Sequence, residues 1–550
     1  MTTGTLPIVT LLDYGAGNVR SVRNAIRKLG YTVQEVVEPA DILRAEKLIF
    51  PGVGSFGAAM ESLQNRGFLE PLRQYLAADR PYLGICLGLQ TLFEGSEESP
   101  GVAGLGLIKG HIERFRAPGL AVPQIGWNGI AMRQPSSLFA DYREEKLYFV
   151  HTYRATASQE NRAWILAETA YGGDFISAVQ RGKVVACQFH PEKSGRAGLN
   201  ILRNFLQEPQ ARPRPVSVAT PAPGVSLGAS GFPPSRTRLA KRIIACLDVR
   251  SNDQGDLVVT KGDQYDVRES GGEVRNLGKP VELAARYFRE GADEVTFLNI
   301  TAFRDFPLED QPMLEVLERA SEEVFVPLTI GGGIREFTDA NGRFYSALDV
   351  AARYFRAGAD KISIGSDAVA VVEDYLRRGR RKDGKSSIEQ IAYVYGNQAV
   401  VISIDPRRVY VKSPDEVPHR VIPTAFPGPN GEEYCWYQCT VKGGREGRDL
   451  DAATLAAACE ELGAGEILLN CIDKDGTNSG FDLELIKMVK EAVGIPVIAS
   501  SGAGRSEHFS EVFTATNAEA ALAAGIFHRR EVEISAVKEH LQRHGIEVRL

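Results

Sequence analysis

The sequence has few cysteines, no long apolar run and no excess of positive charge, and each absence narrows what the chain can be. Its seven cysteines are odd in number and form no C-x-x-C pair, so we expect reduced thiols in a cytoplasmic protein, without disulfides. Cys435 and Cys439 lie close together in CWYQC, but no second pair accompanies them, and we expect no metal site. No apolar run approaches the ~18 residues of a membrane span. The net charge of −6 argues against a basic nucleic-acid-binding surface.

What the sequence does contain is typical of a large globular protein. Of its 550 residues, 43% are hydrophobic and 24% are charged, which permits sizeable cores and predicts two to four domains. Glycine accounts for 55 residues, above its usual share of ~7%, and predicts many tight turns between strands and helices. The N-terminal residues enter an apolar segment directly, without the order of a signal peptide, so we expect an untargeted protein.

A proline-rich segment divides the chain. Residues 207–238 hold seven of the 28 prolines and show no hydrophobic periodicity, which predicts an extended or poorly ordered linker. We therefore expect one domain over residues 1–206 and a second over residues 239–550. These lengths suit one α/β domain and one (β/α)8 barrel.

Each domain has its own strand pattern. In the first, short apolar runs alternate with helical stretches and predict a doubly wound α/β sheet with some antiparallel strands. In the second, eight apolar runs alternate with amphipathic helices, which predicts a (β/α)8 TIM barrel. The first four runs resemble the last four in order and motif, so we expect two half-barrel repeats. The eight predicted strands are residues 242–248, 294–299, 326–331, 360–365, 399–405, 466–473, 495–500 and 519–525.

The first domain contains a candidate nucleophile with its base. Cys86 stands between Gly84 and Gly88 in YLGICLGLQ, where a strand runs into a helix. Glycines on both sides permit the strained turn that lifts a side chain above a sheet, and the field at a helix N-terminus stabilises a thiolate. His190 and Glu192 follow another apolar run in QFHPEK, so a base and the carboxylate that orients it stand together. The three side chains predict a catalytic triad.

With these motifs the first 206 residues resemble the class I glutamine amidotransferases. The matching stretches are LLDYGAGN (11–18), PGVGSFG (51–57), GICLGLQ (84–90) and QFHPEKS (188–194). The resemblance implies that Cys86 forms a glutamyl thioester, that His190 carries the thiol proton to departing ammonia, and that Glu192 orients His190. It also implies that the oxyanion and the substrate glutamine are bound by Gly52, Val53, Gly54, Leu87 and Gln90.

The second domain contains candidate acid–base and phosphate-binding residues at the C-terminal ends of its strands, where barrel active sites lie. Asp248 and Asp405 end strands one and five and face each other across the mouth as candidate acid and base. Glycine-rich turns follow strands three and four and strands seven and eight, and each opens a helix whose N–H groups can bind a phosphate. Lys261, on the loop after strand one, is a candidate lid residue. The other predicted substrate contacts are Gly332, Gly333, Gly365, Ser366, Asp475, Gly476, Gly502, Gly504 and Gly525.

Nearly all of residues 241–550 resembles the cyclase of imidazole glycerol phosphate synthase. The matching stretches include RIIACLDVR, TIGGGI, GADKISI, GAGEILLNCIDKDGTNSGFD and GAGRSEHF. Together with the amidotransferase segment, the chain resembles the fused, eukaryotic-type enzymes of histidine biosynthesis. The resemblance implies that Asp248 and Asp405 are the acid–base pair, that Lys261 is a lid residue, and that the glycine turns hold the two phosphates of a formimino-linked ribulosyl nucleotide. It implies two products, imidazole glycerol phosphate and aminoimidazole carboxamide ribonucleotide, formed with ammonia from glutamine and no cofactor.

Four charged residues open strands at the opposite, N-terminal end of the predicted barrel. Two positive and two negative side chains can form a paired ring around an entrance to the barrel core, and the resemblance places an ammonia gate there. A closed path keeps ammonia from being protonated and diluted. We expect the glutaminase to dock on this face, with Lys193 near Asp360. The predicted gate residues are Arg242, Glu294, Lys361 and Glu466.

Three other functions fit parts of the sequence less well. A glutaminase joined to a pyridoxal phosphate synthase barrel needs a Schiff-base lysine at a strand end, and no predicted strand ends in lysine. A non-catalytic assembly protein does not need every triad and barrel position filled. A sugar-nucleotide isomerase on the same half-barrel repeat does not need the amidotransferase domain. We therefore expect small-molecule substrates, with neither nucleic acid nor membrane as a partner.

Overall fold

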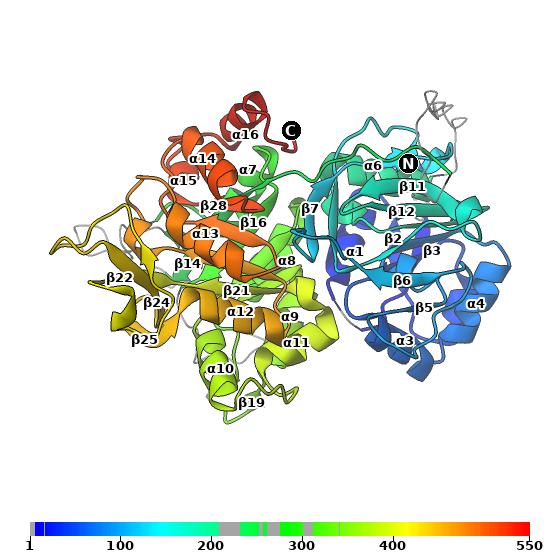
Figure 1. Cartoon of the computed structure of the whole chain (residues 1–550). Helices are drawn as coiled ribbons and strands as arrows, with labels where there is room; N and C mark the ends of the chain where they lie inside the picture. Colours follow the sequence, from blue (N-terminus) through cyan, green and yellow to red (C-terminus); the bar gives the residue numbers. More distant parts are fainter. Residues whose placement is uncertain are drawn as a thin grey trace. The chain divides into compact units, whose positions relative to one another are not determined.

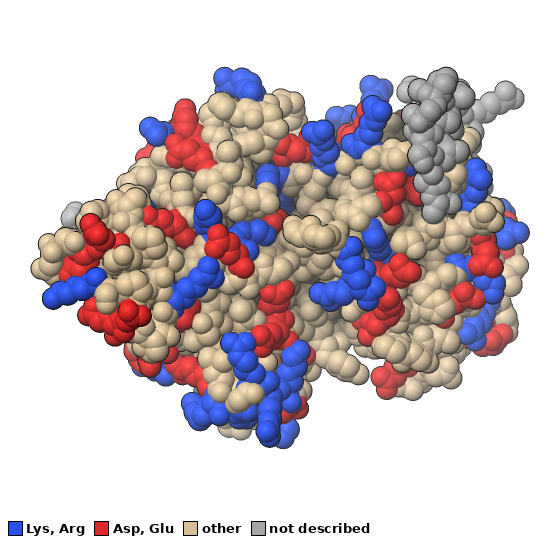
Figure 2. All heavy atoms as spheres, viewed as in Figure 1, with Lys and Arg blue, Asp and Glu red and all other residues tan. Residues whose placement is uncertain are grey.

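The computed structural model describes residues 6–15, 17–207, 231–251, 257–260, 276–300, 312–339 and 341–550. The chain divides between Ala240 and Lys241 into two compact units (Figure 1), and each is described by itself. No helix in these described ranges is long and apolar enough to cross a membrane. Figure 2 shows basic and acidic side chains intermixed over the visible face, in keeping with the small net charge.

The first unit is built on an eight-stranded sheet in the order β2-β1-β3-β4-β13-β12-β11-β8. Neighbouring strands from β2 to β13 are parallel, and β12, β11 and β8 add antiparallel neighbours, so the predicted sheet is confirmed. The strands are β1 (Ile8–Leu11), β2 (Thr32–Glu35), β3 (Leu48–Gly52), β4 (Tyr82–Cys86), β5 (Gly95–Ser96), β6 (His111–Arg114), β7 (Gln124–Asn128), β8 (Ala131–Met132), β9 (Leu147–His151), β10 (Tyr153–Ala155), β11 (Ile165–Ala170), β12 (Asp174–Arg181) and β13 (Val184–Cys187). The helices are α1 (Val19–Lys28), α2 (Pro39–Arg44), α3 (Phe56–Asn65), α4 (Leu69–Ala77), α5 (Leu87–Gln90) and α6 (Gly195–Leu206).

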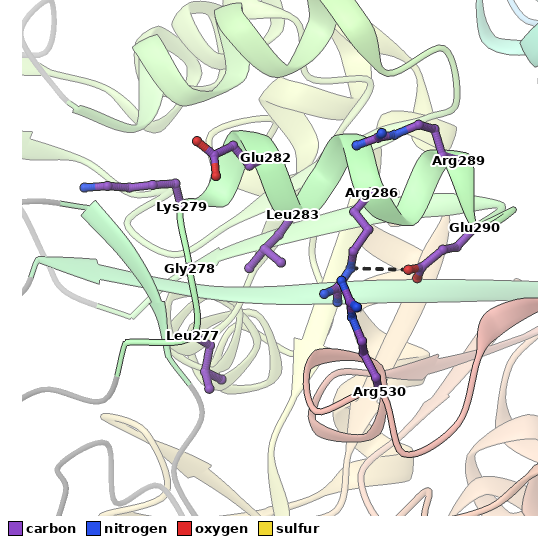
Figure 3. A pocket seen from close by; sticks show the side chains of 9 residues that line it. All are labelled: Leu277, Gly278, Lys279, Glu282, Leu283, Arg286, Arg289, Glu290 and Arg530. Atoms are coloured by element: carbon purple, nitrogen blue, oxygen red, sulfur yellow. Dashed lines mark ion pairs between the residues drawn. The ribbon is translucent and has the colours of Figure 1, made fainter.

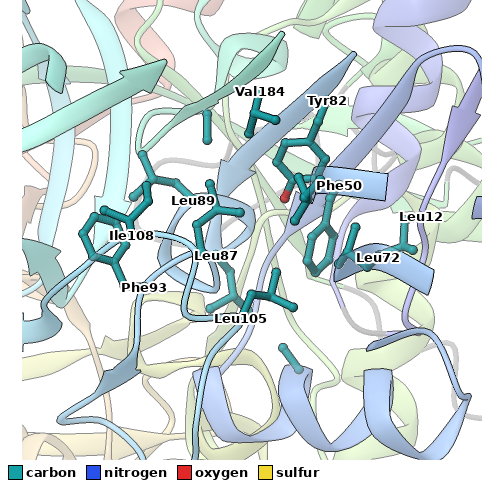
Figure 4. Close-up of a cluster of buried hydrophobic side chains, with 14 of the residues drawn as sticks. Leu12, Phe50, Leu72, Tyr82, Leu87, Leu89, Phe93, Leu105, Ile108 and Val184 are labelled. Atoms are coloured by element: carbon teal, nitrogen blue, oxygen red, sulfur yellow. The ribbon is translucent and has the colours of Figure 1, made fainter. Parts of the chain in front are cut away.

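A hydrophobic core lies directly beneath the turn between β4 and α5. Leu87 and Leu89 of the short helix α5 are buried there with Phe50 of β3 and Tyr82 of β4 (Figure 4). Full burial of a leucine side chain contributes ~1.5–3 kcal/mol. Because α5 is too short to be stable alone, this packing is what fixes it after the strand.

The C-terminal part of the predicted linker runs along the first unit without helix or strand. The ring of Phe232 lies 5.2 Å from the Arg133 guanidinium and 5.3 Å from that of Arg162. The Thr237 hydroxyl accepts a 2.8 Å hydrogen bond from the backbone N–H of Ala170. These contacts tie residues 231–238 to the unit, while residues 208–230 lie outside the described ranges.

The second unit is a closed parallel barrel, as predicted. Its strands follow the order β14-β16-β17-β20-β21-β26-β27-β28, and β28 pairs with β14 to close the ring. The barrel strands are β14 (Arg242–Ser251), β16 (Glu294–Asn299), β17 (Leu328–Gly331), β20 (Lys361–Ile364), β21 (Val400–Ile404), β26 (Glu466–Asn470), β27 (Val497–Ser500) and β28 (Ala520–Ala523). The helices are α7 (Pro280–Arg289), α8 (Pro312–Glu323), α9 (Ala347–Ala357), α10 (Ser366–Arg377), α11 (Ser387–Tyr395), α12 (Ala452–Leu462), α13 (Leu483–Ala492), α14 (Ser506–Thr516), α15 (Gly525–His528) and α16 (Ile534–Arg543).

The second unit also contains short antiparallel strands outside the closed ring of eight. β15 (Leu257–Thr260) pairs with the end of β14, which is longer than predicted, and β18 (Phe337–Thr338) pairs with β19 (Phe344–Tyr345). The long segment after β21 forms a four-stranded insert sheet, in which β24 pairs with the other three strands. The insert strands are β22 (Pro406–Val411), β23 (Ile422–Pro423), β24 (Tyr434–Val441) and β25 (Glu446–Asp451).

Candidate functional site

Three neighbouring strands bring the predicted glutaminase residues to one edge of the first sheet. Gly52 at the end of β3 is the register partner of Cys86 at the end of β4, and Ile85 is the partner of Cys187 at the end of β13. The segments that follow β3 and β13 therefore lie on either side of Cys86. This arrangement depends on the order in which parallel strands pair, because their carboxyl ends share one edge.

Cys86 occupies a strained turn that its flanking glycines permit. Its φ of 54° lies in a region that non-glycine residues rarely adopt, as expected of a nucleophile lifted above a sheet. A Cβ added at Gly84 would lie 2.6 Å from the carbonyl oxygen of Gly88, and one added at Gly88 would lie 2.2 Å from that of Phe50. Both glycines are therefore required by close packing of the turn.

The side chains of Cys86, His190 and Glu192 lie together and are buried. Nδ1 of His190 lies 2.8 Å from Oε1 of Glu192. Burial by itself lowers the pKa of His190, but the charges of Glu192 and Cys86, and hydrogen bonds to both, raise this pKa well above its usual range. The arrangement favours a protonated His190 beside Cys86, and an imidazolium so placed can supply a proton to the leaving group after the sulfur attacks a carbonyl carbon.

The predicted oxyanion loop lies against this turn. A Cβ added at Gly52 would lie 2.4 Å from Cβ of Leu87 and 2.7 Å from the backbone nitrogen of Gly88. Gly54 has a φ of 131°, and the Tyr14 hydroxyl donates a hydrogen bond to the carbonyl of Val53. The loop is thereby held close to the N-terminus of α5, where backbone N–H groups are available to an anion.

Gln90 has a structural connection that the sequence did not indicate. Its amide nitrogen donates to Oε1 of Gln188 at 3.1 Å and to the carbonyl of Tyr153 at 3.0 Å. The amide nitrogen of Gln188 in turn lies 3.3 Å from Sγ of Cys86. Sequence reasoning missed Gln188, although it begins the QFHPEK motif, because its amide could equally have been a core group.

Glu98 is a second group that sequence reasoning missed. Burial raises its pKa to about 7, against the hydrogen bond that it accepts from the backbone N–H of Phe56 at 2.7 Å. Burial raises the pKa of Tyr14, and the charges of Cys86 and Glu98 raise it further, so both groups approach the same tyrosine. The stretch SEESP carries no motif that could have revealed Glu98.

Asp248 lies within β14, where this strand pairs with β15, and Asp405 directly follows β21. β14 and β21 lie four strands apart in either direction around the barrel. Burial raises the pKa of Asp405, the hydrogen bond from Asn470 at 2.9 Å opposes this shift, and the charge of Asp475 adds to it. Asp475 is buried, and its Oδ1 lies 3.4 Å from the hydroxyl of Ser501. The mouth therefore holds three carboxylates, and the environment of Asp405 shifts its pKa upward, a difference of the kind that can divide acid and base roles.

The glycine turns on opposite sides of the mouth share one geometry. Gly332 after β17 has a φ of 91°, and an added Cβ would lie 2.1 Å from the carbonyl oxygen of Asn299. Gly502 after β27 has a φ of 94°, and an added Cβ would lie 2.2 Å from that of Gly480. α10 begins directly after Gly365, and α14 begins two residues after Gly504. The other predicted contacts in these turns are Gly333, Ser366, Gly476 and Gly525, and Lys261 lies outside the described residues.

Four buried charges form a closed ring at the N-terminal end of the barrel. Arg242 lies 2.9 Å from Glu294 and also pairs with Glu466. Lys361 lies 2.8 Å from Glu294 and 2.6 Å from Glu466. Burial raises the pKa of Glu466, but Arg242 and Lys361 outweigh it and hold this pKa below its ordinary value. Each cation thus contacts both carboxylates.

Apolar side chains fill the barrel interior. This cluster consists of Ile244, Cys246, Val401, Leu468, Ile498, Ala520 and Leu522. Every member belongs to a barrel strand, and β14 and β26 each begin with a ring residue. The charged ring and this apolar cluster are therefore both inside the barrel, the ring at the N-terminal ends of the strands.

A pocket of about 610 Å³ lies along the outer side of α7 (Figure 3). Arg286 and Arg530 approach each other there, and Arg286 pairs with Glu290 at 3.4 Å. The described residues that line it include none of the predicted site residues, so this pocket is separate from the chemistry above.

Known protein families match each of the two units of the chain. The family model of glutamine amidotransferase class-I matches residues 10–208, and that of histidine biosynthesis protein matches residues 242–533. The chain is 61% identical over 546 residues to "Imidazole glycerol phosphate synthase hisHF, chloroplastic" of Arabidopsis thaliana, over 99% of this chain and 90% of that protein. It is 55% identical over 553 residues to "Imidazole glycerol phosphate synthase hisHF" of Schizosaccharomyces pombe, over 98% of this chain and all of that protein. Its barrel part is 41% identical over 312 residues to "Imidazole glycerol phosphate synthase subunit HisF" of Methanothermobacter thermautotrophicus, over 57% of this chain and all of that protein.

Proposed function

The chain belongs to the fused imidazole glycerol phosphate synthases, bifunctional enzymes of histidine biosynthesis that join a glutamine amidotransferase to a cyclase, and we propose how its own residues divide that work. We assign the glutaminase to residues 1–206, the linker to 207–238 and the cyclase to 239–550. The observation that carries the assignment is the buried contact between Cys86, His190 and Glu192. The same chain has a barrel in which Asp248 of β14 and Asp405 after β21 come from strands on opposite sides.

In the glutaminase, Sγ of Cys86 attacks the amide carbon of glutamine. The backbone N–H of Leu87 and the Gly52–Gly54 loop stabilise the oxyanion, and loss of one such donor typically costs ~2.7–4 kcal/mol. The carbon–nitrogen bond then breaks as His190 gives its proton to the departing ammonia. Water hydrolyses the thioester with His190 as the base, and Glu192 keeps the ring oriented throughout. Gln90 holds Gln188 against the thiol, and Glu98 balances the positive charge of the substrate's amino group.

In the cyclase, Asp248 and Asp405 exchange protons with the bisphosphorylated nucleotide as ammonia is incorporated. The raised pKa of Asp405, caused first by its burial, suits this residue to the role of the acid in the pair. The turns at Gly332–Gly333 and Gly502–Gly504 bind the two phosphates through backbone N–H groups. Lys261 closes over the substrate as a lid.

The charged ring acts as a gate between the two reactions. Ammonium is poorly soluble in an apolar interior, whereas neutral ammonia enters it at far lower cost. A ring in which both cations contact both carboxylates is shut, and at least one ion pair must open to pass ammonia. The glutaminase docks on this face of the barrel, with Lys193 near Asp360.

One assay tests this division of labour. Glutamine hydrolysis by the full chain is measured with and without the bisphosphorylated nucleotide, and imidazole glycerol phosphate is measured beside glutamate. We expect hydrolysis to accelerate with nucleotide and the two products to form in equal amounts. Hydrolysis that ignores the nucleotide, with no imidazole product, refutes the proposal.

We also propose that the enzyme works in the cytoplasm on small molecules alone. All seven cysteines are free and buried, which suits a reducing compartment. The Arabidopsis relative is named chloroplastic, so fractionation of cells that express the full chain decides between the two compartments.

A further inference from the structure

The insert sheet after β21 is anchored to the cyclase site by one arginine. Arg408 lies on β22, three residues after Asp405, and its side chain is only 6% exposed. Its guanidinium lies 2.6 Å from Oδ2 of Asp482 and 2.9 Å from the hydroxyl of Tyr437. The same hydroxyl donates to Oδ1 of Asp482 at 2.8 Å. A buried arginine, tyrosine and carboxylate thus contact one another between the insert sheet and the N-terminus of α13.

Aromatic rings enclose this guanidinium. It lies 5.5 Å from the centre of the Tyr437 ring and 5.0 Å from that of Phe426. Both rings belong to the insert, so the arginine side chain has little freedom to leave Asp482.

Arg408 contacts both ends of a single loop. Its backbone N–H donates to Oδ2 of Asp473 at 2.6 Å, at the start of residues 473–482. Its guanidinium holds Asp482 at the end of that loop, where the carboxylate also caps α13 by accepting from the backbone N–H of Leu485 at 3.0 Å. The loop between them carries Asp475, whose charge contributes to the raised pKa of Asp405.

The same loop supports the phosphate-binding turn after β27. The backbone N–H of Gly480 donates to the carbonyl of Gly502 at 2.8 Å. A Cβ added at Gly504 would lie 2.4 Å from the carbonyl oxygen of Asn478, so the two segments are in close backbone contact. A shift of loop 473–482 therefore displaces the turn, because no slack separates them.

We infer that Arg408 is a positioning residue of the cyclase: by holding both ends of loop 473–482, it keeps Asp475 and the phosphate-binding turn at residues 501–504 in place. The inference rests on the proposed function of the barrel, in which that turn binds a substrate phosphate. It also gives the insert sheet a role, which is to carry the clamp formed by Arg408, Tyr437 and Phe426. Arg408 acts through the loop and does not itself touch the reacting atoms.

The test compares two substitutions on opposite faces of one strand. Arg408→Met removes the guanidinium contacts with Asp482 and Tyr437 and keeps the backbone hydrogen bond to Asp473. Arg407→Met removes an exposed arginine that contacts Gln438 at 2.7 Å on the other face. Cyclase activity of the full chain is measured with ammonium salts, so that the glutaminase is not involved. We expect Arg408→Met to raise KM for the nucleotide about tenfold to a hundredfold and to lower kcat. Arg407→Met should leave both within twofold of wild type, on the order of experimental scatter.

The pH profile separates positioning from a loss of stability alone. Burial is the largest cause of the raised pKa of Asp405; among its neighbouring groups, Asn470 and Ser403 lower this pKa and Asp475 raises it. Withdrawal of Asp475 should therefore move the acidic limb of the Arg408→Met profile to lower pH. Arg408→Lys keeps one positive charge opposite Asp482. Its KM for the nucleotide and the position of its acidic limb should therefore lie between those of Arg408→Met and those of the wild type.

Three other results would overturn the inference about Arg408. An Arg408→Met variant with wild-type KM and an unmoved acidic limb overturns the inference. If that variant does not fold, Asp473→Ala removes the acceptor at the exposed end of the loop, and we expect KM to rise by about threefold or more; an unchanged KM overturns the inference. A wild-type chain that forms no imidazole product from ammonia overturns the proposed function itself, and the inference with it.

Discussion

Substitution of Glu466 by glutamine tests the charged ring most directly. The ring contains two cations and two carboxylates, and its side chains are at most 1% exposed. Glutamine keeps the size of the side chain and can accept a hydrogen bond, but it leaves Arg242 and Lys361 facing Glu294 alone. Removal of one partner from a buried ion pair costs about 3–5 kcal/mol. Since the free energy of unfolding of a domain is typically about 5–15 kcal/mol, we expect this substitution to lower it by a large fraction for the barrel, as measured by urea unfolding.

A charge-balanced double substitution separates stability from gating. Lys361→Met with Glu466→Leu removes one charge of each sign and leaves Arg242 paired with Glu294 at 2.9 Å. Replacement of a buried pair by apolar groups is often neutral, so we expect most of the lost stability to return. However, the double variant lacks two of the four charged side chains that form the proposed gate. In both variants we expect less imidazole product than glutamate, while the wild type forms equal amounts.

Two results would refute this reasoning. A loss below about 1 kcal/mol in Glu466→Gln, the size of an exposed pair, means that the ring is not electrostatically isolated. Full one-to-one coupling in the double variant means that the ring is not the gate. The pH dependence gives a further check: burial raises the pKa of Glu466, but Arg242 and Lys361 bring it below its ordinary value. Its contribution is therefore present above the unfolded pKa, is lost as pH falls through the folded one, and should be missing from the glutamine variant.

The remaining predictions concern the two reaction sites. Cys86→Ser should lower glutamine-dependent synthesis by about 10⁴-fold or more while ammonia-dependent synthesis stays near wild type, measured with each nitrogen source in turn; equal losses with both sources would contradict the assignment. Asp405→Asn should lower synthesis by about 10²–10⁴-fold with either source and leave basal glutamine hydrolysis unchanged, and activity with ammonia alone would show that this carboxylate is dispensable. Burial raises the pKa of Glu98 to about 7, so its ionised form is lost as pH falls through 7, and we expect KM for glutamine to rise there. Glu98→Gln should raise KM above pH 7 to the value that the wild type shows at low pH, and so flatten this dependence, whereas a wild-type profile in the variant would remove Glu98 from the substrate site.

Much of the fold and of the chemistry could be predicted because it is encoded locally. The turn at Cys86 requires glycine on both sides within five residues, and GICLG displays that requirement in one stretch. His190 and Glu192 are two residues apart, so their contact needs little more than the local backbone. The eight barrel strands are similarly visible, since a strand buried on both faces is a short continuous apolar run.

Other features could not be predicted because they join residues that are distant in sequence. Arg242 and Glu466 are 224 positions apart, and the sequence predicted a paired ring of four strand-start residues without saying which cation contacts which carboxylate. That each cation contacts both carboxylates follows from the register of the strands, which no single segment encodes. Glu98 and Gln188 likewise acquire their places from neighbouring elements of the sheet.

The sequence by itself determined which chemistry this protein carries: a thiol with its base and carboxylate, opposed aspartates, and turns open to phosphate. These depend on residue types and backbone conformations set within a few positions. The tertiary structure alone decided how that chemistry is held, through the closed ring of Arg242, Glu294, Lys361 and Glu466 and through Arg408, which reaches Asp482 from 74 positions away. The physical reason is that buried charges must find partners in space, and only the packing of the finished fold brings those partners together.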